Sequence, residues 1–141
     1  MSDLLDQEHA DAGLNLLLAN SALGPTRVFD GRVPDPTPDP PYIVVYTTVS
    51  WTREGIGTAL NGTQVTITTT WNCRCVGLTA AAARAMAMQV RSSLLNQRPV
   101  IPGRNCGPIK QWDDPMPAQR DESTGRLVMD EPVTYGFIST G

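Results

Sequence analysis

The sequence predicts a single α+β domain, in which a mixed, mostly antiparallel sheet of about four or five strands is flanked by two main helices. Three segments carry this prediction. Residues 42–51, YIVVYTTVSW, are rich in β-branched and aromatic side chains, residues 64–76 alternate between two faces, and residues 78–97 consist mostly of strong helix formers. With one short strand before them and further strands after them, the expected element order is α-β-β-β-α-β-β.

Length and composition fit one domain over residues 1–141. The chain has 40% apolar residues, which is enough for one core, and 18% charged residues with a net charge of −3. A negative chain has no overall positive field to attract nucleic acid.

The acidic start MSDLLDQEHA lacks the basic region of a secretory signal, and no apolar run approaches a membrane span. Three cysteines, an odd number, fit a reducing compartment. We expect a cytosolic product with no membrane partner.

Residues 2–20 predict the first helix. Acidic side chains near its start suit the positive end of the helix dipole, and Gly13 weakens it slightly. His9 is the only histidine of the chain, and we expect it at the surface of this helix. The apolar positions near helical spacing are Leu5, Ala12, Leu16 and Ala19.

A short strand and a proline-rich loop follow the first helix. Gly24-Pro25 ends the helix, and TRVFDG at residues 26–31 is a strand candidate with an Asp-Gly turn signal. The stretch PDPTPDPP at residues 34–41 could serve as a polyproline ligand, as a linker between domains or as a spacer. Residues 1–32 are too few for a domain of their own. We therefore interpret residues 32–41 as a stiff connection between two strands.

Two long strands follow the prolines. Both faces of residues 42–51 are largely apolar, which is typical of a central, covered strand, and Asn61-Gly62 favours a hairpin turn into the next strand. Residues 64–76 place one set of side chains toward a core and the other toward water or a partner. The core set is Val65, Ile67, Thr69, Trp71, Cys73 and Cys75. The other set is Gln64, Thr66, Thr68, Thr70, Asn72 and Arg74.

The second helix, residues 78–97, carries two stripes. Thr79 is placed to cap its start. The core stripe is Met86, Val90 and Leu94, flanked by Ala83 and Ala87. A basic stripe is formed by Arg84, Arg91 and Arg98, seven residues apart. Such a stripe keeps a helix soluble, neutralises phosphates or pairs with acids on a neighbouring subunit.

The remainder of the chain predicts mostly loops and strands. Residues 99–117 are broken by Pro and Gly and hold at most one short strand near residues 109–112. DESTGR at residues 121–126 is typical of a turn. Residues 126–140 form a final β segment, in which Pro132 indicates a bulge or an edge position.

No segment carries a convincing catalytic or cofactor site. Cys73, Cys75 and Cys106 could hold zinc, but structural zinc sites usually have two close ligand pairs, so we interpret these thiols as small core residues. A nucleophile needs a positioned base, and one surface His9 is a weak candidate.

The acids Asp113 and Asp114 lie in a loop with no neighbour that would shift their pKa, and no glycine segment matches a phosphate-binding pattern. We expect a protein that is not an enzyme and has no cofactor or metal.

Several motifs follow one another in a characteristic order. After a short N-terminal helix come VFDGRVPDP, PYIVVY, a long strand ending in CRCVG, a helix with VRSSLL, RPVIPGRNCG, a polar DDPMPAQRDESTGRL region and VTYGFIST. In this order and spacing the chain resembles the tail terminator, or tail completion, proteins of bacteriophages with long, non-contractile tails, particularly those of actinobacteria. The resemblance covers about residues 4–140.

The resemblance implies a virion protein that assembles in the host cytoplasm into a ring, typically a hexamer. The ring caps the head-proximal end of the tail tube, stops tube polymerisation and offers a joining surface to the head. Its partners would be other copies of itself, the major tail-tube protein and the head-tail connector. DNA would pass through the lumen without tight binding, because each subunit is negative.

Several features are candidate contact surfaces for such a ring. The candidate interface or lumen residues are Arg84, Arg91, Arg98, Thr66, Thr68, Thr70 and Arg74. In the proline-rich loop, candidates for contact with an adjacent subunit or the tail tube are Pro34, Asp35, Pro38 and Asp39. The loops at residues 52–61 and 113–124 are further candidates.

Other functions stay open at this point. A neck or head-completion connector also forms rings of small α/β subunits, and a minor tail protein belongs to the same structural class. A more distant alternative is a small cytosolic enzyme or metal-binding regulator that uses the three cysteines.

Overall fold

The computed structural model describes residues 2–24, 26–34, 36–53, 65–113, 116–123 and 125–141. It is an α+β structure with two helices and one mixed sheet, as predicted. The expected hairpin turn at Asn61-Gly62 and the loop candidate Asp35 lie outside the described residues. No helix among the described residues is long and apolar enough to cross a membrane.

The described residues form a sheet of seven strands rather than the predicted four or five. The main path runs β1, β2, β3, β7 and β4, and β5 and β6 also pair with β7. Among the described strand pairs, only β1 and β2 run parallel, and the other pairs are antiparallel. The strands are β1 (Val28–Asp30), β2 (Tyr42–Arg53), β3 (Val65–Gly77), β4 (Asn105–Cys106), β5 (Lys110–Gln111), β6 (Gln119–Asp121) and β7 (Val128–Thr140).

The two faces of β3 differ as the sequence predicts. The residues buried on the core face are Ile67, Thr69, Trp71, Cys73 and Cys75. On the opposite face Thr66, Thr68, Thr70 and Asn72 are half-buried and Arg74 is exposed. β2 is covered on both faces only over its first residues, Tyr42 to Val45, because its later residues on the second face are exposed. The alternation therefore separates a core face from an open face.

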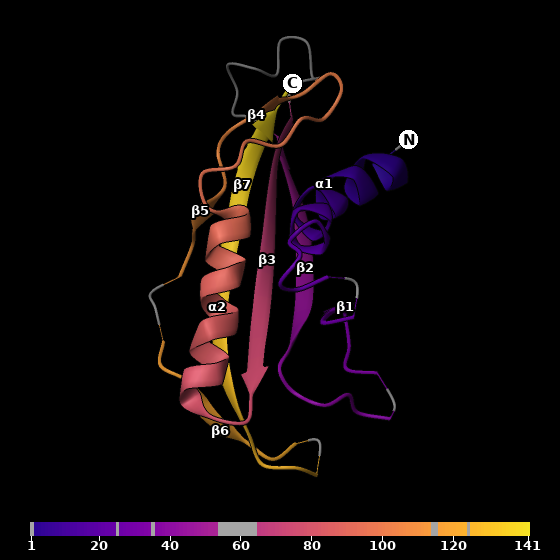
Figure 1. Ribbon diagram of the computed structural model, residues 1–141. Helices are drawn as coiled ribbons and strands as arrows, with labels where there is room; N and C mark the ends of the chain where they lie inside the picture. Colours follow the sequence, from indigo (N-terminus) through magenta and orange to yellow (C-terminus); the bar gives the residue numbers. More distant parts are fainter. Residues whose placement is uncertain (1, 25, 35, 54–64, 114–115, 124) are drawn as a thin grey trace.

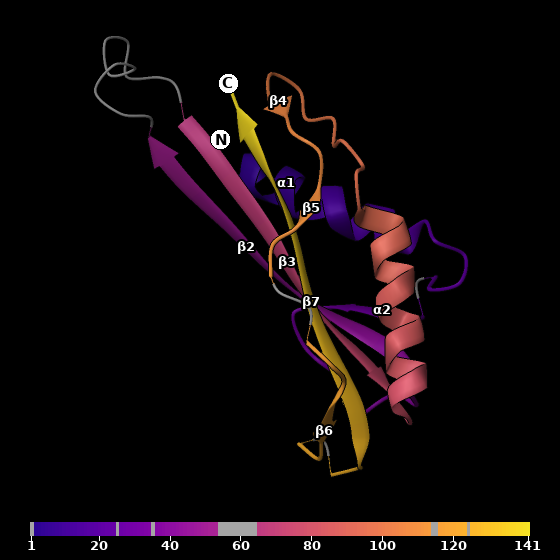
Figure 2. The ribbon, with the colours of Figure 1, turned by 90° about the vertical axis from the view of Figure 1, so that its left-hand side faces the viewer.

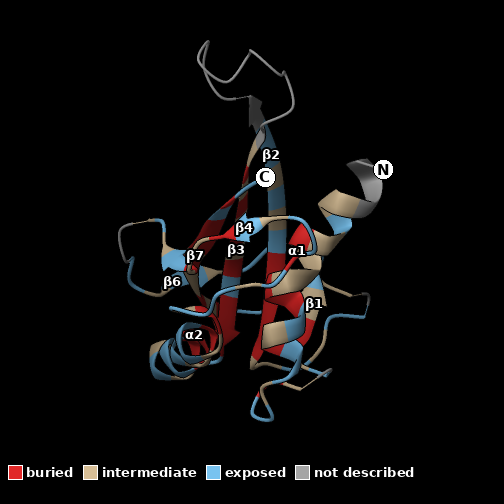
Figure 3. Ribbon diagram, turned by 90° about the horizontal axis from the view of Figure 1, so that it is seen from above, coloured by how far each residue is buried: buried red, intermediate tan, exposed pale blue. Residues whose placement is uncertain are grey.

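Both helices, α1 (Ser2–Leu18) and α2 (Ala80–Leu94), pack on the core face of the sheet (Figures 1 and 2). Buried residues gather where the helices meet the strands (Figure 3). Thr79 caps α2 as predicted, because its side-chain oxygen accepts a hydrogen bond of 3.1 Å from the Ala82 N–H. The buried stripe of α2 is Ala83, Met86, Ala87, Val90 and Leu94, which confirms the predicted core stripe.

The second helix is shorter than its sequence suggests. It ends at Leu94 instead of residue 97, because Leu95 has an extended backbone and Asn96 a left-handed one with φ of 66°. The prediction that Arg98 continues the basic stripe along this helix is therefore wrong. Arg98 lies in the following loop, and its Nη1 donates a hydrogen bond of 2.7 Å to the carbonyl oxygen of Cys106.

Helix α1 is attached to the sheet through Trp71 of β3. The indole is buried and stacks on Phe137 with ring centroids 5.6 Å apart, and its N–H donates a hydrogen bond of 3.0 Å to the carbonyl of Ala10. A Cβ atom at Gly13 would lie 2.3 Å from the indole. The glycine that weakens the helix in isolation is what allows the helix to lie against the ring.

The proline-rich segment is a spacer between β1 and β2, as predicted. Because β1 and β2 run parallel, the segment between them has to carry the chain from the end of β1 back to the side of the sheet where β1 began. Val33 packs beside a small apolar cluster on the open face, and Asp39 pairs with Arg126 at 3.0 Å. Near β2, Nη1 of Arg27 donates to the carbonyl of Pro41 at 2.9 Å, and the Pro40-Pro41 peptide is cis. The segment is thus held at both ends.

The last strand falls within the predicted segment but is more central in the sheet than predicted. β7 is continuous from Val128 to Thr140 and lies between β3 and the short outer strands, so the strand is not interrupted at Pro132 and the alternative of a bulge there is wrong, whereas the alternative of an edge position fits the pairing. β5 confirms the short strand expected near residues 109–112, whereas β4 and β6 were not predicted. Along the outer side of β7, the described strands pair with residues 128–130, 135–136 and 139–140, so Pro132 falls in the gap.

We predict that Gly13→Ala destabilises the protein although alanine favours a helix. The helix-propensity gain is about 1 kcal/mol. The overpacked methyl group at the indole costs about 1–3 kcal/mol or more. We expect a net loss of free energy of unfolding in urea titrations. Asn15→Ala, at an exposed position of the same helix, is the matched control and should be neutral or slightly stabilising. A Gly13→Ala protein as stable as the control would contradict the close packing of α1 on Trp71.

Candidate assembly surfaces

The open face of the sheet is a row of hydroxyl groups with aromatic and aliphatic neighbours. Thr66, Thr68 and Thr70 of β3 lie opposite Thr52, Ser50 and Thr48 of β2. The other neighbours of this row, on β7, are Thr140, Ile138 and Gly136. Tyr46 and Ile138 are 45% and 44% exposed on this face. The threonine candidates therefore share one accessible surface that is largely uncharged.

Arg74 lies at one end of this face. Among the candidate residues on the open face it is the only one that forms an ion pair in the described part of the chain. Nε of Arg74 donates to Oδ2 of Asp130 at 3.1 Å. Asp130 is buried, and its Oδ1 has no partner among the described residues. Burial raises the pKa of Asp130, and the Arg74 guanidinium partly opposes that shift.

The Arg74–Asp130 pair borders a cavity of about 330 Å³ on the open face. One wall is apolar and aromatic, from Tyr42, Val44 and Tyr46, and the other is acidic, from Asp121 beside Asp130. Hydrogen bonds from Ser123 lower the pKa of Asp121, so this second carboxylate is stabilised in its charged form. The cavity can accept a polar or cationic group from a partner.

The basic stripe of α2 is reduced to two arginines. Arg84 and Arg91 are exposed, and Met88 between them is 65% exposed. Together with Gln111, Glu131 and Tyr135 they border a shallow groove of about 150 Å³ between α2 and β7. The structure therefore brings Arg84 and Arg91 together and separates Arg98 from them.

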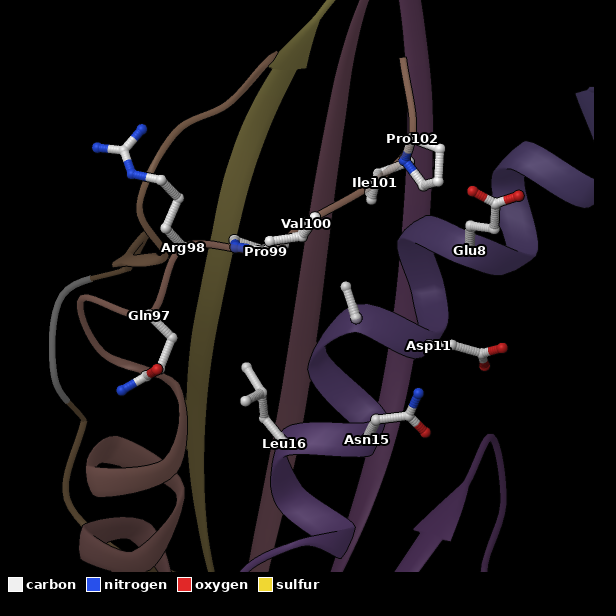
Figure 4. A pocket seen from close by; sticks show the side chains of 11 residues that line it. Glu8, Asp11, Asn15, Leu16, Gln97, Arg98, Pro99, Val100, Ile101 and Pro102 are labelled. Carbon is white, nitrogen blue, oxygen red and sulfur yellow. The ribbon is translucent and has the colours of Figure 1, made fainter. Parts of the chain in front are cut away.

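A larger groove of about 560 Å³ lies between α1 and the loop at residues 97–102 (Figure 4). Glu8, Asp11 and Asn15 line it from α1, and Val100, 92% exposed, lines it from the loop. In Figure 4 the side chains of Asp11 and Asn15 point away from α2, whereas Leu16 points toward it. No sequence motif marked this groove, because its two walls come from segments about 90 residues apart.

The three cysteines are buried, and they behave as the core residues that the sequence suggested. Burial raises the pKa of Cys73 to about 12 and raises the pKa values of Cys75 and Cys106 as well. A metal ligand or nucleophile has to be a thiolate, which these environments disfavour. Among the described residues, no three His, Cys, Asp or Glu side chains are grouped so that they could hold a metal ion.

His9 is completely buried, so the expectation of a surface histidine is wrong. Its Nδ1–H donates to the Leu5 carbonyl at 2.8 Å, and its Nε2 accepts a hydrogen bond of 2.7 Å from the Ser139 hydroxyl. The ring also stacks on Phe137. Arg104 donates from Nε and Nη2 to the same hydroxyl oxygen, at 3.2 and 3.1 Å. The acidic residues near His9 in the sequence suggested an exposed position, but on α1 the His9 side chain faces Ser139.

The pair of His9 and Ser139 has the hydrogen bond of a nucleophile and its base. Both side chains are 0% exposed, however, and a nucleophile must reach its substrate. The pair instead joins α1 to the end of β7.

In the proline-rich loop the candidate contacts differ in accessibility. Pro34 and Pro38 are half-buried, whereas the Asp39 side chain is 91% exposed and paired with Arg126. Pro36 and Thr37 between them are exposed. The loop therefore has fixed ends and an accessible middle.

No protein-family model matches the chain, and no curated protein matches it in sequence. Among solved structures, the fold is similar to that of a chain in the "Virion of native gene transfer agent (GTA) particle". The TM-score is 0.68 at 18% sequence identity, and the match covers 93% of this chain and 93% of that chain. At this identity the likeness concerns the fold, and it extends over nearly the whole of both chains.

We predict that Asp130→Asn changes how stability depends on pH. Because the pKa of Asp130 is raised in the folded state, the charged carboxylate lowers the free energy of unfolding at pH 7. Protonation removes this loss of stability as the pH falls through the folded pKa toward the usual value of about 4. The free energy of unfolding of Asp130→Asn relative to wild type should therefore decrease from pH 7 to about pH 4.

Urea titrations at several pH values measure this difference. The control is Glu122→Gln, an exposed carboxylate in a surface pair with Arg120, for which the difference should change little. A difference for Asp130→Asn that stays constant or grows as pH falls contradicts the raised pKa.

Proposed function

We propose that this protein is a structural virion protein of a bacteriophage, a tail terminator whose copies form a ring on the head-proximal end of the tail tube. The ring stops tube polymerisation and offers the joining surface to the head-tail connector. Its action is binding, without an enzymatic step or a cofactor. The site of action is the virion tail, after assembly in the host cytoplasm.

The observation that carries this proposal is the fold match over 93% of both chains with a chain of a gene transfer agent virion. The order of sequence motifs, which resembles tail terminators, supports the same class independently of the fold comparison. Buried cysteines with raised pKa values and a buried His9 make the alternative of a thiol-based enzyme or metal regulator less favourable.

A ring of identical subunits needs two different, complementary surfaces on each subunit. The open face with Thr66, Thr68 and Thr70 is unlike the helix-covered face in composition. We assign the open face to the lumen or to a subunit contact, with Arg74 at its end. Uncharged hydroxyl groups and a net charge of −3 suit a passage in which DNA slides without tight binding.

The second candidate is a neck or head-completion connector, which the same fold match supports, and a minor tail protein is a third. These functions differ in the partner that is bound. A terminator binds the end of a tail tube, whereas a neck protein binds the connector of a filled head.

We predict that the purified protein forms closed rings, alone or on tail tubes. Size-exclusion chromatography with light scattering measures the mass, and negative-stain imaging shows whether rings form and whether they lie at one end of tubes made of the tail-tube protein. Rings that bind only heads favour the neck protein. A protein that stays monomeric and also fails to bind tubes and heads contradicts the proposed function.

We predict that the proline-rich loop takes part in assembly through its exposed middle. Replacing residues 34–39 by a Gly-Ser turn should leave the chain folded but reduce ring formation or tube capping. Arg126→Ala is the control, because it removes the ion pair with Asp39, worth at most about 1 kcal/mol, but leaves every residue of the loop in place. A replaced loop with full assembly activity would show that the segment acts only as a spacer.

A further inference from the structure

The charged side chains of the two helices form no ion pair in the described part of the protomer, although Asp6 accepts a hydrogen bond from Nε1 of Trp51 and Arg91 lies against the Tyr135 hydroxyl. Among the described residues the ion pairs are Arg74–Asp130, Arg120–Glu122 and Arg126–Asp39, and none of them involves a helix. Arg84 and Arg91 of α2 and Glu8 and Asp11 of α1 therefore have no charged partner in the described part of the chain. Asp11 accepts a hydrogen bond only from neutral Gln7, at 2.7 Å.

The arginines of α2 lie on the side of the helix that is remote from α1. The chain after α1 reaches α2 at Gln89 and Ser93, whose side chains accept hydrogen bonds from Nδ2 of Asn20 at 3.1 and 2.8 Å. With 3.6 residues per turn, Arg84, Met88 and Arg91 lie about half a turn away from that contact. They border β7 and Gln111 of the outer strand β5 instead. We call Arg84, Met88 and Arg91 the basic flank.

The acids of α1 lie on the opposite side of the helical layer. Glu8, Asp11, Asn15 and Leu18 are three or four residues apart, so they form one stripe of the helix. Asp11 and Asn15 point away from α2 (Figure 4), and Leu18 is 41% exposed. We call these four residues the acidic flank.

We infer that the basic flank of one copy docks on the acidic flank of the next copy, so that the helical layers of neighbouring subunits form the head-to-tail contact of the ring. This inference rests on the proposed function. It assigns the two complementary surfaces that a closed ring needs to named residues on two helices.

Charge complementarity and apolar contact have separate parts in this interface. Exposed ion pairs contribute at most about 1 kcal/mol each, so they orient the partners more than they hold them. Met88 on the basic flank can meet Leu18 and the exposed Val100 at the groove beside α1. Glu131 also borders the basic flank and reduces its positive potential. Arg84 and Arg91 are therefore the residues of this flank that would meet the acids of the next copy.

The same charges oppose the wrong assembly. A symmetric dimer through α2 would place four arginines together, and one through α1 would place four acids together. Like charges across an interface are unfavourable, so head-to-head pairing is disfavoured while head-to-tail pairing is favoured. The separation of charge on one face of the sheet thereby selects rings over isolated pairs.

Charge reversal tests this assignment in the full-length protein. Arg84→Glu with Arg91→Glu makes both flanks acidic, and Glu8→Lys with Asp11→Lys makes both flanks basic. Each double variant alone should need a protein concentration at least about tenfold higher to form rings. Native mass spectrometry and light scattering measure ring formation, and circular dichroism checks that each variant is folded.

Mixing gives the sharper result. An equimolar mixture of the two double variants restores opposite charges at every contact if the copies alternate around the ring, so rings with an even number of subunits should return. The chain that carries all four substitutions should also form rings by itself. Such rescue cannot come from a misfolded variant.

Lys110→Glu with Arg120→Glu is the matched control for Arg84→Glu with Arg91→Glu, because it changes the net charge by the same amount at exposed residues outside both helices and outside the proline-rich loop. It should form rings as wild type does. Wild-type rings that persist in both flank variants, or a control that loses rings as they do, would overturn the assignment and leave the proposed function standing. A wild type without rings, alone or on tail tubes, would overturn both.

Discussion

The contact of α1 with Trp71 organises this structure. One indole ring joins the middle strand to α1 by stacking on Phe137, by donating its N–H to the Ala10 carbonyl and by meeting the bare backbone of Gly13. The hydrogen bond from Ser139 to His9 holds the same helix at the end of β7. Because α1 is held there, both helices share one face, and the other face of the sheet is left open.

That arrangement gives a small domain several unlike surfaces. The open face carries threonine hydroxyls and ends at the Arg74–Asp130 pair. On the helical layer, arginines lie on one flank and acids on the other, and they form no ion pair among the described residues. In the proposed function each subunit contacts two neighbours, a tube and a head, and several unlike surfaces suit that requirement.

Much of the fold could be predicted from local patterns, and the misses have physical reasons. The alternation around Trp71 predicted both faces of β3. Arg98 was misplaced because the helix ends where Asn96 turns left-handed, and the residues before it are good helix formers that gave no warning. At Pro132 the bulge was wrong and the edge position fits, because a proline can lie within a continuous strand where its missing N–H is not needed, and no described outer strand pairs with β7 at that residue.

Periodicity was enough to predict the core stripe of α2 and the burial of Cys73 and Cys75, and the order of the predicted elements was enough for the α+β class, since each depends on contacts within one element or between consecutive ones. Tertiary structure decided the rest. The burial of His9, the short strands β4 and β6 and the groove beside α1 each join segments far apart in the chain. A residue's own neighbours in sequence carry no information about such partners, because only the packing of the whole chain brings them together.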